Sequence, residues 1–281
     1  MKQHVVSRSI AVIAGVVMGL LSITPARAIV ISPNADLYDL VNALLSGGGI
    51  TVLSVSLSYQ SDPSGIVLST GTFTNTSGTY GIGDGIVLST GNVADYSDGP
   101  NTSTGTSFGY GTPATPAQEG LLDPITGGSY DHFDVTQLDI TFLTSTGDVH
   151  FYVVFGSEEY SEYVGTTFVD GFGVYLDGAN IAYAGGLPVN INHPSMAPIP
   201  GTELDGILAP NGNPLLFFNA TGLDTSISHT LTFILADTSD ADFDTTVYIS
   251  QLGGTVIPEP GTWLLMLSGL SPVALRLRRR S

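Results

Sequence analysis

The run Val149-His150-Phe151-Tyr152-Val153-Val154-Phe155 is the clearest β-strand signal in this sequence of 281 residues. Its apolar side chains at every second position would line one face, because successive side chains of a strand point to opposite sides. Further strands are predicted at 53–59, 138–144, 168–176, 229–236 and 245–252. Turns rich in Gly and Asn separate them. This pattern favours a mainly β chain folded as an antiparallel, jelly-roll-like β-sandwich.

One short helix near the N-terminus is predicted ahead of these strands. Residues 36–46 carry Leu and Val at helical spacing. Asn34 is the expected N-cap, and three glycines at 47–49 are expected to end the helix by favouring left-handed backbone.

Two other stretches are predicted to form strands or loops rather than helices. The segment Gly-Ile-Val-Leu-Ser-Thr-Gly occurs at 65–71 and again at 85–91, which predicts two equivalent short strands that end in turns. Residues 95–128 are rich in Gly, Ser, Thr and Pro, and they are expected to form a long surface loop.

The N-terminus has the three zones of a secretory signal peptide. Two basic residues precede an apolar stretch at 10–21, and Ala26 and Ala28 form a small-x-small cleavage site. The apolar stretch is short for a membrane span of about 20 residues. Residues 1–28 are therefore expected to form a signal-peptide helix that enters the Sec translocon. Signal peptidase would then leave a mature chain that begins near Ile29.

The C-terminus carries a second targeting pattern. Pro258, Glu259 and Pro260 precede an apolar run at 263–275, and the chain ends with four arginines: Arg276, Arg278, Arg279 and Arg280. An apolar helix followed at once by arginines stops transfer, with its basic end in the cytoplasm. The predicted transmembrane helix is short, which suits a temporary hold in the inner membrane. An ordinary anchor would explain the helix and the arginines but not the Pro-Glu-Pro.

This order of tripeptide, short transmembrane helix and basic terminus resembles the PEP-CTERM sorting signal. The resemblance implies a Gram-negative bacterium, processing by an exosortase near the tripeptide, and a link with exopolysaccharide. The expected organisation is a signal peptide at 1–28, one domain at 29–254 and a sorting tail at 255–281. After a transient inner-membrane stage, the domain is expected at the cell surface or in the extracellular matrix.

Charge is distributed unevenly along the chain. All 7 Lys and Arg residues lie in the two ends that processing would remove, whereas every Asp and Glu except Glu259 lies within 29–254. There is no cysteine, so disulfides and thiolate metal sites are excluded. Nucleic acid is not an expected partner, because phosphate binding requires cations. Crowded carboxylates here need hydrogen bonds, protonation or bound cations, although solubility alone would also explain the acidity.

Two acidic stretches follow predicted strands and suggest a calcium site. Glu158 and Glu159 come just after the strand at 149–155, and Asp170 lies close by in sequence. The turn between the last two strands holds Asp237, Asp240, Asp242 and Asp244. Calcium takes six to eight oxygen ligands, mostly from carboxylates and carbonyls. The Gly and terminal Glu of an EF-hand are missing, so the ion would tie the two stretches together at the sandwich edge. A solvated acidic turn is the alternative.

Three segments produce a second resemblance. They are Phe155-Gly156-Ser157-Glu158-Glu159-Tyr160, the run at 168–178, and the acidic turn and strand at 236–249. With the helix, the glycine turn and the Leu-Ser-Thr-Gly segment, they resemble the choice-of-anchor L domain family over nearly all of the mature chain. Two mild departures are Val169-Asp170, where the family often has Asn-Asp, and Asp244-Thr245, where it often has Asp-Ser. The resemblance implies a surface module with varied anchors and brings no catalytic activity.

A glycan hydrolase is the least favoured alternative. Its two carboxyl groups must flank one bond at about 5 to 9.5 Å, whereas neighbours such as Glu158 and Glu159 point to opposite faces of a strand. The histidines of the domain are scattered singly: His132, His150, His193 and His229. The sequence therefore predicts a non-enzymatic exported protein that acts in adhesion or associates with exopolysaccharide in a biofilm. A calcium-stabilised carbohydrate-binding module is the second hypothesis.

Overall fold

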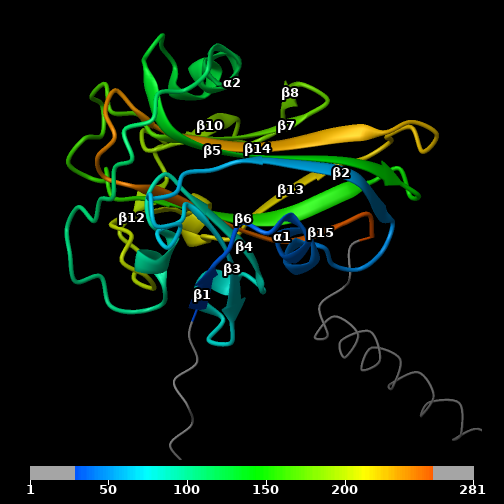
Figure 1. Ribbon diagram of the computed structural model, residues 1–281, viewed down its shortest axis with the longest axis horizontal. Coiled ribbons are helices and arrows are strands. Elements are labelled where there is room, and N and C mark those ends of the chain that lie inside the picture. The colour runs from blue at the N-terminus through cyan, green and yellow to red at the C-terminus, as the bar shows by residue number, and fades with distance from the viewer. Residues whose placement is uncertain (1–28, 256–281) are drawn as a thin grey trace, which may run out of the picture.

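The computed structural model describes residues 29–255, and these residues form two β-sheets stacked face to face (Figure 1). The first sheet has eight strands, in the order β1 (Ile29–Pro33), β3 (Thr70–Asn75), β4 (Gly85–Ser89), β15 (Thr245–Gly253), β6 (Val149–Ser157), β12 (Gly206–Leu208) and β11 (Met196–Ala197), with β13 (Leu216–Ala220) also paired to β6. The second has seven, in the order β2 (Ile50–Ser58), β5 (His132–Thr144), β14 (His229–Thr238), β7 (Gly171–Leu176), β10 (Leu187–Asn190) and β9 (Tyr183–Ala184), with β8 (Ala179–Asn180) paired to β7. Neighbouring strands run antiparallel, so the predicted mainly β, two-sheet architecture is confirmed.

The core between the sheets is built from the alternating residues that the sequence pattern predicts. Val149, Phe151, Val153 and Phe155 of β6 and Leu231, Phe233 and Leu235 of β14 all belong to one buried cluster. The rings of Phe151 and Phe233 meet edge to face, with their centroids 5.2 Å apart. Burial of each such side chain contributes about 1.5–3 kcal/mol. The two sheets are therefore held together by strands from the middle and the end of the chain.

The predicted N-terminal helix is present as α1 (Leu37–Leu44), with different ends from those expected. Its N-cap is Asp36, whose carboxylate accepts the backbone N–H groups of Tyr38 and Asp39. The side chain of Asn34 instead accepts the N–H of Asp36. The helix ends before the glycines, because Leu45 takes extended backbone and bridges to Leu252. The long-range bridge thus ends the helix earlier than the glycine run alone would.

A second helix, α2 (Pro116–Thr126), lies inside the segment predicted as a surface loop, so that prediction was wrong here. Thr115 is its N-cap and forms a reciprocal capping box with Gln118, and Pro116 occupies the first turn. The helix packs on the outer face of the second sheet, where Leu122 and Ile125 join a small buried cluster (Figure 1). Three short 3-10 turns complete the helices: η1 (Thr79–Gly81), η2 (Val93–Tyr96) and η3 (Pro210–Gly212).

The two copies of the repeated segment do not form equivalent strands. The second copy supplies β4, but most of the first copy is a turn, because Asp62 accepts the N–H groups of Ser64, Ile66 and Val67. Hydrogen bonds from Ser64 and Val67 lower the pKa of this exposed carboxyl to about 2. A side chain outside the repeat therefore decides the difference between the copies.

The predicted signal peptide, with Ala26 and Ala28, and the predicted tail, with Pro258, Glu259, Pro260 and its arginines, lie outside the described residues. Within 29–255, none of the helices is both long enough and apolar enough to span a bilayer.

Candidate functional site

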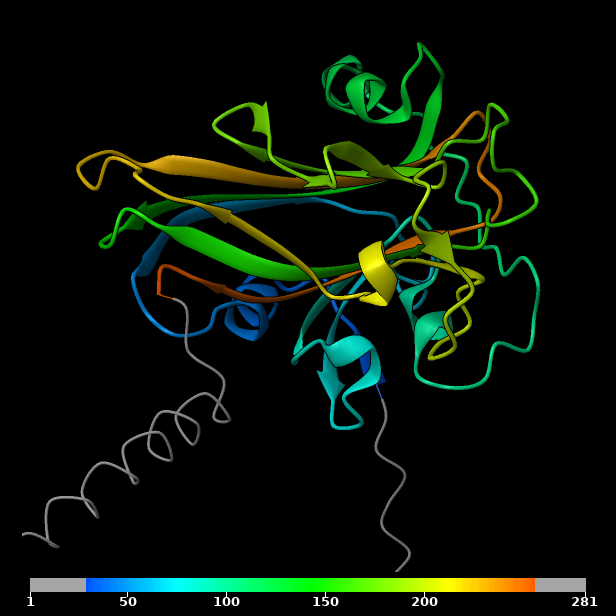
Figure 2. The same cartoon turned by 180° about the vertical axis from the view of Figure 1, so that it is seen from behind.

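Three segments far apart in sequence meet at one end of the sandwich, on the left in Figure 1 and on the right in Figure 2. They are the loop at 101–112, the turn at 158–170 after β6, and the turn at 239–244 between β14 and β15. Strand register brings them together, because Ser157 at the end of β6 pairs with Thr245 at the start of β15. The two acidic stretches therefore lie side by side, whereas the calcium ion expected to tie them together stays a prediction.

Direct hydrogen bonds join the two acidic stretches. The N–H of Glu158 donates to the carbonyl of Asp244 over 3.0 Å. The N–H of Thr238 donates to Asp170 Oδ1 over 2.8 Å, and the hydroxyl of Thr245 donates to Asp170 Oδ2 over 2.8 Å. Asp170 is therefore a structural link between the stretches without any ion.

Five of the seven predicted ligands are buried here and form what we call the buried carboxylate cluster: Glu158, Glu159, Asp170, Asp237 and Asp244. The exposed fraction of each is 2 % or less. Asp240 is half-buried and Asp242 is exposed, so these two lie at the rim. Burying carboxylates is costly unless hydrogen bonds, protons or cations compensate for lost water.

The loop at 101–112, called the donor loop below, supplies part of this compensation through its backbone. The N–H groups of Gly105 and Thr106 donate to Glu158 Oε2 over 3.2 and 3.0 Å. The N–H of Phe108 donates to Asp244 Oδ1 over 2.9 Å. Oriented backbone amides bind anions well, so a loop rich in Gly, Ser and Thr serves here in place of lysine or arginine.

Backbone N–H groups of the donor loop also donate hydrogen bonds to two further carboxylates, those of Asp134 and Glu203. Asp134, fully buried on β5, accepts three backbone N–H groups, from Tyr110, Gly111 and Thr112, at 2.7 to 3.0 Å. Glu203 accepts the N–H groups of Thr102 and Ser103. Neither acid was predicted from the sequence to belong to this region, because the N–H groups that bind them come from residues that are not their neighbours in the chain.

Two glycines allow the chain to approach this closely. A Cβ on Gly91 would lie 1.7 Å from Asp244 Oδ2. Gly105 has a φ of +91°, and a Cβ there would lie 2.1 Å from the ring of Phe243. A side chain at Gly105 would push the donor loop away from its place, and one at Gly91 would displace the carboxylate of Asp244.

Four oxygens of the buried carboxylate cluster remain without a hydrogen-bond partner among the described residues. They are Oε1 of Glu158, Oε2 of Glu159 and both carboxylate oxygens of Asp237. Each buried acceptor left unpaired costs about 1–3 kcal/mol. Glu158, Glu159 and Asp237, the inner part of the cluster, thus lack hydrogen bonds to some of their buried oxygens. Both carboxylate oxygens of Asp244 and of Asp170 accept hydrogen bonds.

Burial raises the pKa of every member of the cluster. For Glu158 it raises the pKa to about 8, opposed by the N–H groups of Thr106 and Gly105. For Asp244 it raises the pKa to about 6, opposed by bonds from Phe108 and Tyr96. Burial and mutual repulsion also raise the pKa values of Glu159, Asp170 and Asp237. Near neutral pH, part of the cluster holds protons unless a cation replaces them.

The spacing of the oxygens bears on the predicted calcium site. Among residues 29–255, the one group of three whose ligand atoms all lie within 4.8 Å of one another is Glu119, Asp123 and His132, on α2 and β5. This group was not predicted from the sequence, because α2, which carries two of its members, was not predicted. His132 Nδ1 lies 2.5 Å from Glu119 Oε2, a direct contact that leaves no room for a metal ion between these two atoms. The predicted calcium ligands are gathered, but not at the spacing of a closed coordination shell.

Adjacent Glu158 and Glu159 do not face one another as the paired acids of a glycosidase would. Glu158 turns to the donor loop, whereas repulsion from Asp170 is the largest charge effect on Glu159. Their different surroundings agree with the prediction that neighbouring residues point apart.

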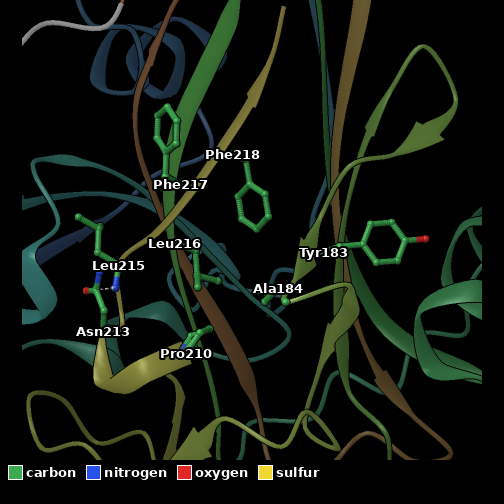
Figure 3. Close-up of a pocket in the computed structure, with 9 residues that line it drawn as sticks. Tyr183, Ala184, Pro210, Asn213, Leu215, Leu216, Phe217 and Phe218 are labelled. Atoms are coloured by element: carbon green, nitrogen blue, oxygen red, sulfur yellow. Dashed lines mark hydrogen bonds between the residues drawn. The ribbon is translucent and has the colours of Figure 1, made fainter.

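A separate hollow of about 270 Å³ opens at the side of the sandwich, between β13 and β9 (Figure 3). Phe218 and Leu216 point into the space between the sheets, while the ring of Tyr183 points away from it. No carboxylate or histidine lines this hollow, so the titratable groups of the candidate site lie at the acidic end.

Comparison with models of protein families matches residues 30–207 to the choice-of-anchor L domain. No curated protein and no solved structure matches the chain. The matched span contains the Phe155–Tyr160 run but stops before β13, β14 and β15, so it is shorter than the sequence resemblance suggested. It nevertheless covers more than half of the 281 residues, and the protein belongs to the choice-of-anchor L domain family.

Proposed function

We propose that this protein is a non-enzymatic module of the cell surface or extracellular matrix that takes part in adhesion or associates with exopolysaccharide. Membership of the choice-of-anchor L family supports a surface-associated protein. The proposal further holds that a signal peptide exports the chain and that an exosortase processes its tail after a stay in the inner membrane.

The observation that carries this proposal is that the described strands lie between the two expected processing sites. They run from β1 to β15, which ends at Gly253, before Pro258. Processing at both sites would therefore leave every described strand in place. It would also remove all Lys and Arg and release an anionic domain.

Comparing the tagged full chain in cells with and without their exosortase tests the proposal. The expected result is a shorter, extracellular chain in the first case and a longer, membrane-associated chain in the second. Replacing Pro258, Glu259 and Pro260 by alanine should reproduce the second result in cells that have the enzyme. Identical size and location in all three cases would contradict the proposed route. Co-sedimentation of the processed chain with the producing cells' exopolysaccharide tests the proposed role.

A calcium-stabilised module is the second candidate, and the unpaired oxygens of Glu159 and Asp237 favour it. Both side chains are buried, and burial together with the charge of Asp170 raises the pKa of both. A divalent cation drawn in by small side-chain shifts would pair these oxygens and link the turns that follow β6 and β14. The rim residues Asp240 and Asp242 would add ligands from the solvent side.

A further inference from the structure

A hollow of about 170 Å³ lies beside Glu158, on the solvent side of the buried carboxylate cluster. We call it the Glu162 hollow; its walls include Thr104, Glu158, Glu162, Tyr163, Asp205 and Phe243. A second hollow of about 230 Å³ shares Thr104, Glu162 and Asp205 with it. A ligand with groups on both sides can therefore occupy the two together.

Three carboxyl groups give the Glu162 hollow an acidic wall. Glu158 is 2 % exposed, and while its Oε2 takes the donor-loop N–H groups, its Oε1 has no partner among the described residues. Asp205 accepts one bond from Asn101, and Glu162 is exposed. Residues 29–255 contain no Lys or Arg, so no ammonium or guanidinium group of this part of the chain neutralises the wall.

Two aromatic side chains, Tyr163 and Phe243, also line the Glu162 hollow. The rings of Tyr163 and Phe243 lie 5.2 Å apart, and Tyr163 also meets Phe168 edge to face at 5.3 Å. Phe243 holds its ring against Gly105 from a backbone φ of +61°. Aromatic faces attract organic cations through their quadrupoles, whereas calcium binds through oxygen ligands.

The spacing of the carboxylates also argues against a metal here. Within the described part of the chain, Glu158, Glu162 and Asp205 do not form a set whose oxygens all lie within 4.8 Å. A calcium ion would need such a set around it. An ammonium group instead donates hydrogen bonds to separate acceptors, which the spread of these carboxylates permits.

We propose that the Glu162 hollow binds a primary ammonium group, carried by an amino sugar of an extracellular glycan. The glycan part of this assignment rests on the proposed function. The ammonium lies between the carboxylates and the rings of Tyr163 and Phe243. The hydroxyl of Thr104 and the adjoining hollow at Ser161 receive the hydroxyl groups of the sugar ring.

Calorimetric titration of the full chain tests the proposal with glucosamine oligosaccharides. N-acetylated oligosaccharides of the same length are the matched probe without the charge, and a lysine peptide of equal charge is the matched probe without the sugar. Glu162→Gln and Asp205→Asn remove charge from partly exposed positions and should leave the fold intact. Asp148→Asn, in the turn between β5 and β6 at the other end, is the control variant.

The expected result is saturable binding of the glucosamine oligosaccharide that weakens at least tenfold in Glu162→Gln and in Asp205→Asn and stays unchanged in Asp148→Asn. The acetylated probe should bind at least tenfold more weakly than the amine. Equal binding of the acetylated probe, equal binding of the lysine peptide, or no binding at all would each overturn the assignment. Competition by calcium chloride alone, lost in the same two variants, would overturn it in favour of a divalent cation.

Failure of this inference can be told apart from failure of the proposed function. If the exopolysaccharide of the producing cells sediments the chain but no amine binds, the function stands and the ammonium site is wrong. If the amine binds and the exopolysaccharide does not sediment the chain, the site stands and the proposed role is wrong.

Discussion

Asp134 and Asp237 are both buried aspartates on neighbouring strands of the second sheet, yet their surroundings differ completely. Asp134 faces the donor loop and accepts three backbone N–H groups. Asp237 faces other carboxylates, and neither of its oxygens has a partner among the described residues. The comparison shows that, in a domain without lysine or arginine, backbone N–H groups can compensate a buried acid such as Asp134. A buried acid that lacks such donors, such as Asp237, depends on protons or cations.

The largest expected difference comes from substituting asparagine at both positions. Asp134→Asn must point an NH₂ group at a backbone N–H, which costs about 2–3 kcal/mol of unfolding free energy. Asp237→Asn replaces a carboxyl group whose burial and charged neighbours oppose its ionisation, so stability should stay the same or rise by about 1 kcal/mol. Urea unfolding of the two variants measures both effects. A loss in Asp237→Asn as large as that in Asp134→Asn would break the comparison.

The next effect concerns the close approach of the donor loop. Gly105 and Gly111 both have positive φ, but a Cβ at Gly105 would meet Phe243, whereas nothing lies within 4 Å at Gly111. Gly111→Ala should cost about 1 kcal/mol from backbone conformation alone. Gly105→Ala should cost roughly 2–3 kcal/mol, because the loop must also shift. Equal losses in urea unfolding would show that the loop does not press on this site.

Calcium should act on the inner side of the cluster if it binds there. A site saturated at one hundred times its dissociation constant adds about 2.7 kcal/mol, and a domain of this size then melts roughly 5–10 °C higher. The rise should be present in Asp148→Asn and absent in Asp237→Asn. Thermal unfolding with calcium and with a chelator measures it. An unchanged midpoint in the native chain would rule out the calcium-stabilised candidate.

The smallest effect gives a baseline away from both regions. Thr115→Ala removes the N-cap of α2 and should cost about 1 kcal/mol. Because α2 packs on the outer face of the second sheet, the calcium response should stay as in the native chain. An altered response would mean that α2 and the acidic end are coupled.

Periodicity in the sequence was sufficient to predict the central strands. β6, β14 and β15 lie close to their expected ranges, because each carries alternating side chains that enter one core, whereas β5 begins at His132, ahead of the expected 138–144. α2 was missed because a polar composition concealed the capping box of Thr115 and Gln118. β1 was missed because its five residues give little periodic signal.

The sequence indicated which acidic residues belong to the candidate site, but not which groups hydrogen-bond to them. The calcium hypothesis placed Glu158, Glu159 and Asp170 near the aspartates of the last turn, because dense acid without a basic counterion indicated a shared cation. The donors were not predictable, because Phe108 reaches Asp244 across 136 positions of the chain. Which oxygens stay unpaired depends on these long-range bonds, and no local pattern records them.

The pH dependence of stability tests the central claim most directly. Glu158 has a pKa of about 8 in the folded chain, against about 4.5 when unfolded, so the folded state holds more protons between these values. Its stabilising contribution is complete below pH 4.5 and is lost as the pH rises towards 8. Together with the other raised carboxyls, this should lower the unfolding free energy by on the order of 2–3 kcal/mol between pH 5 and 8 in urea titrations without added cations. Stability that stays level or rises over this range would contradict the claim that protons or cations compensate the inner carboxylates.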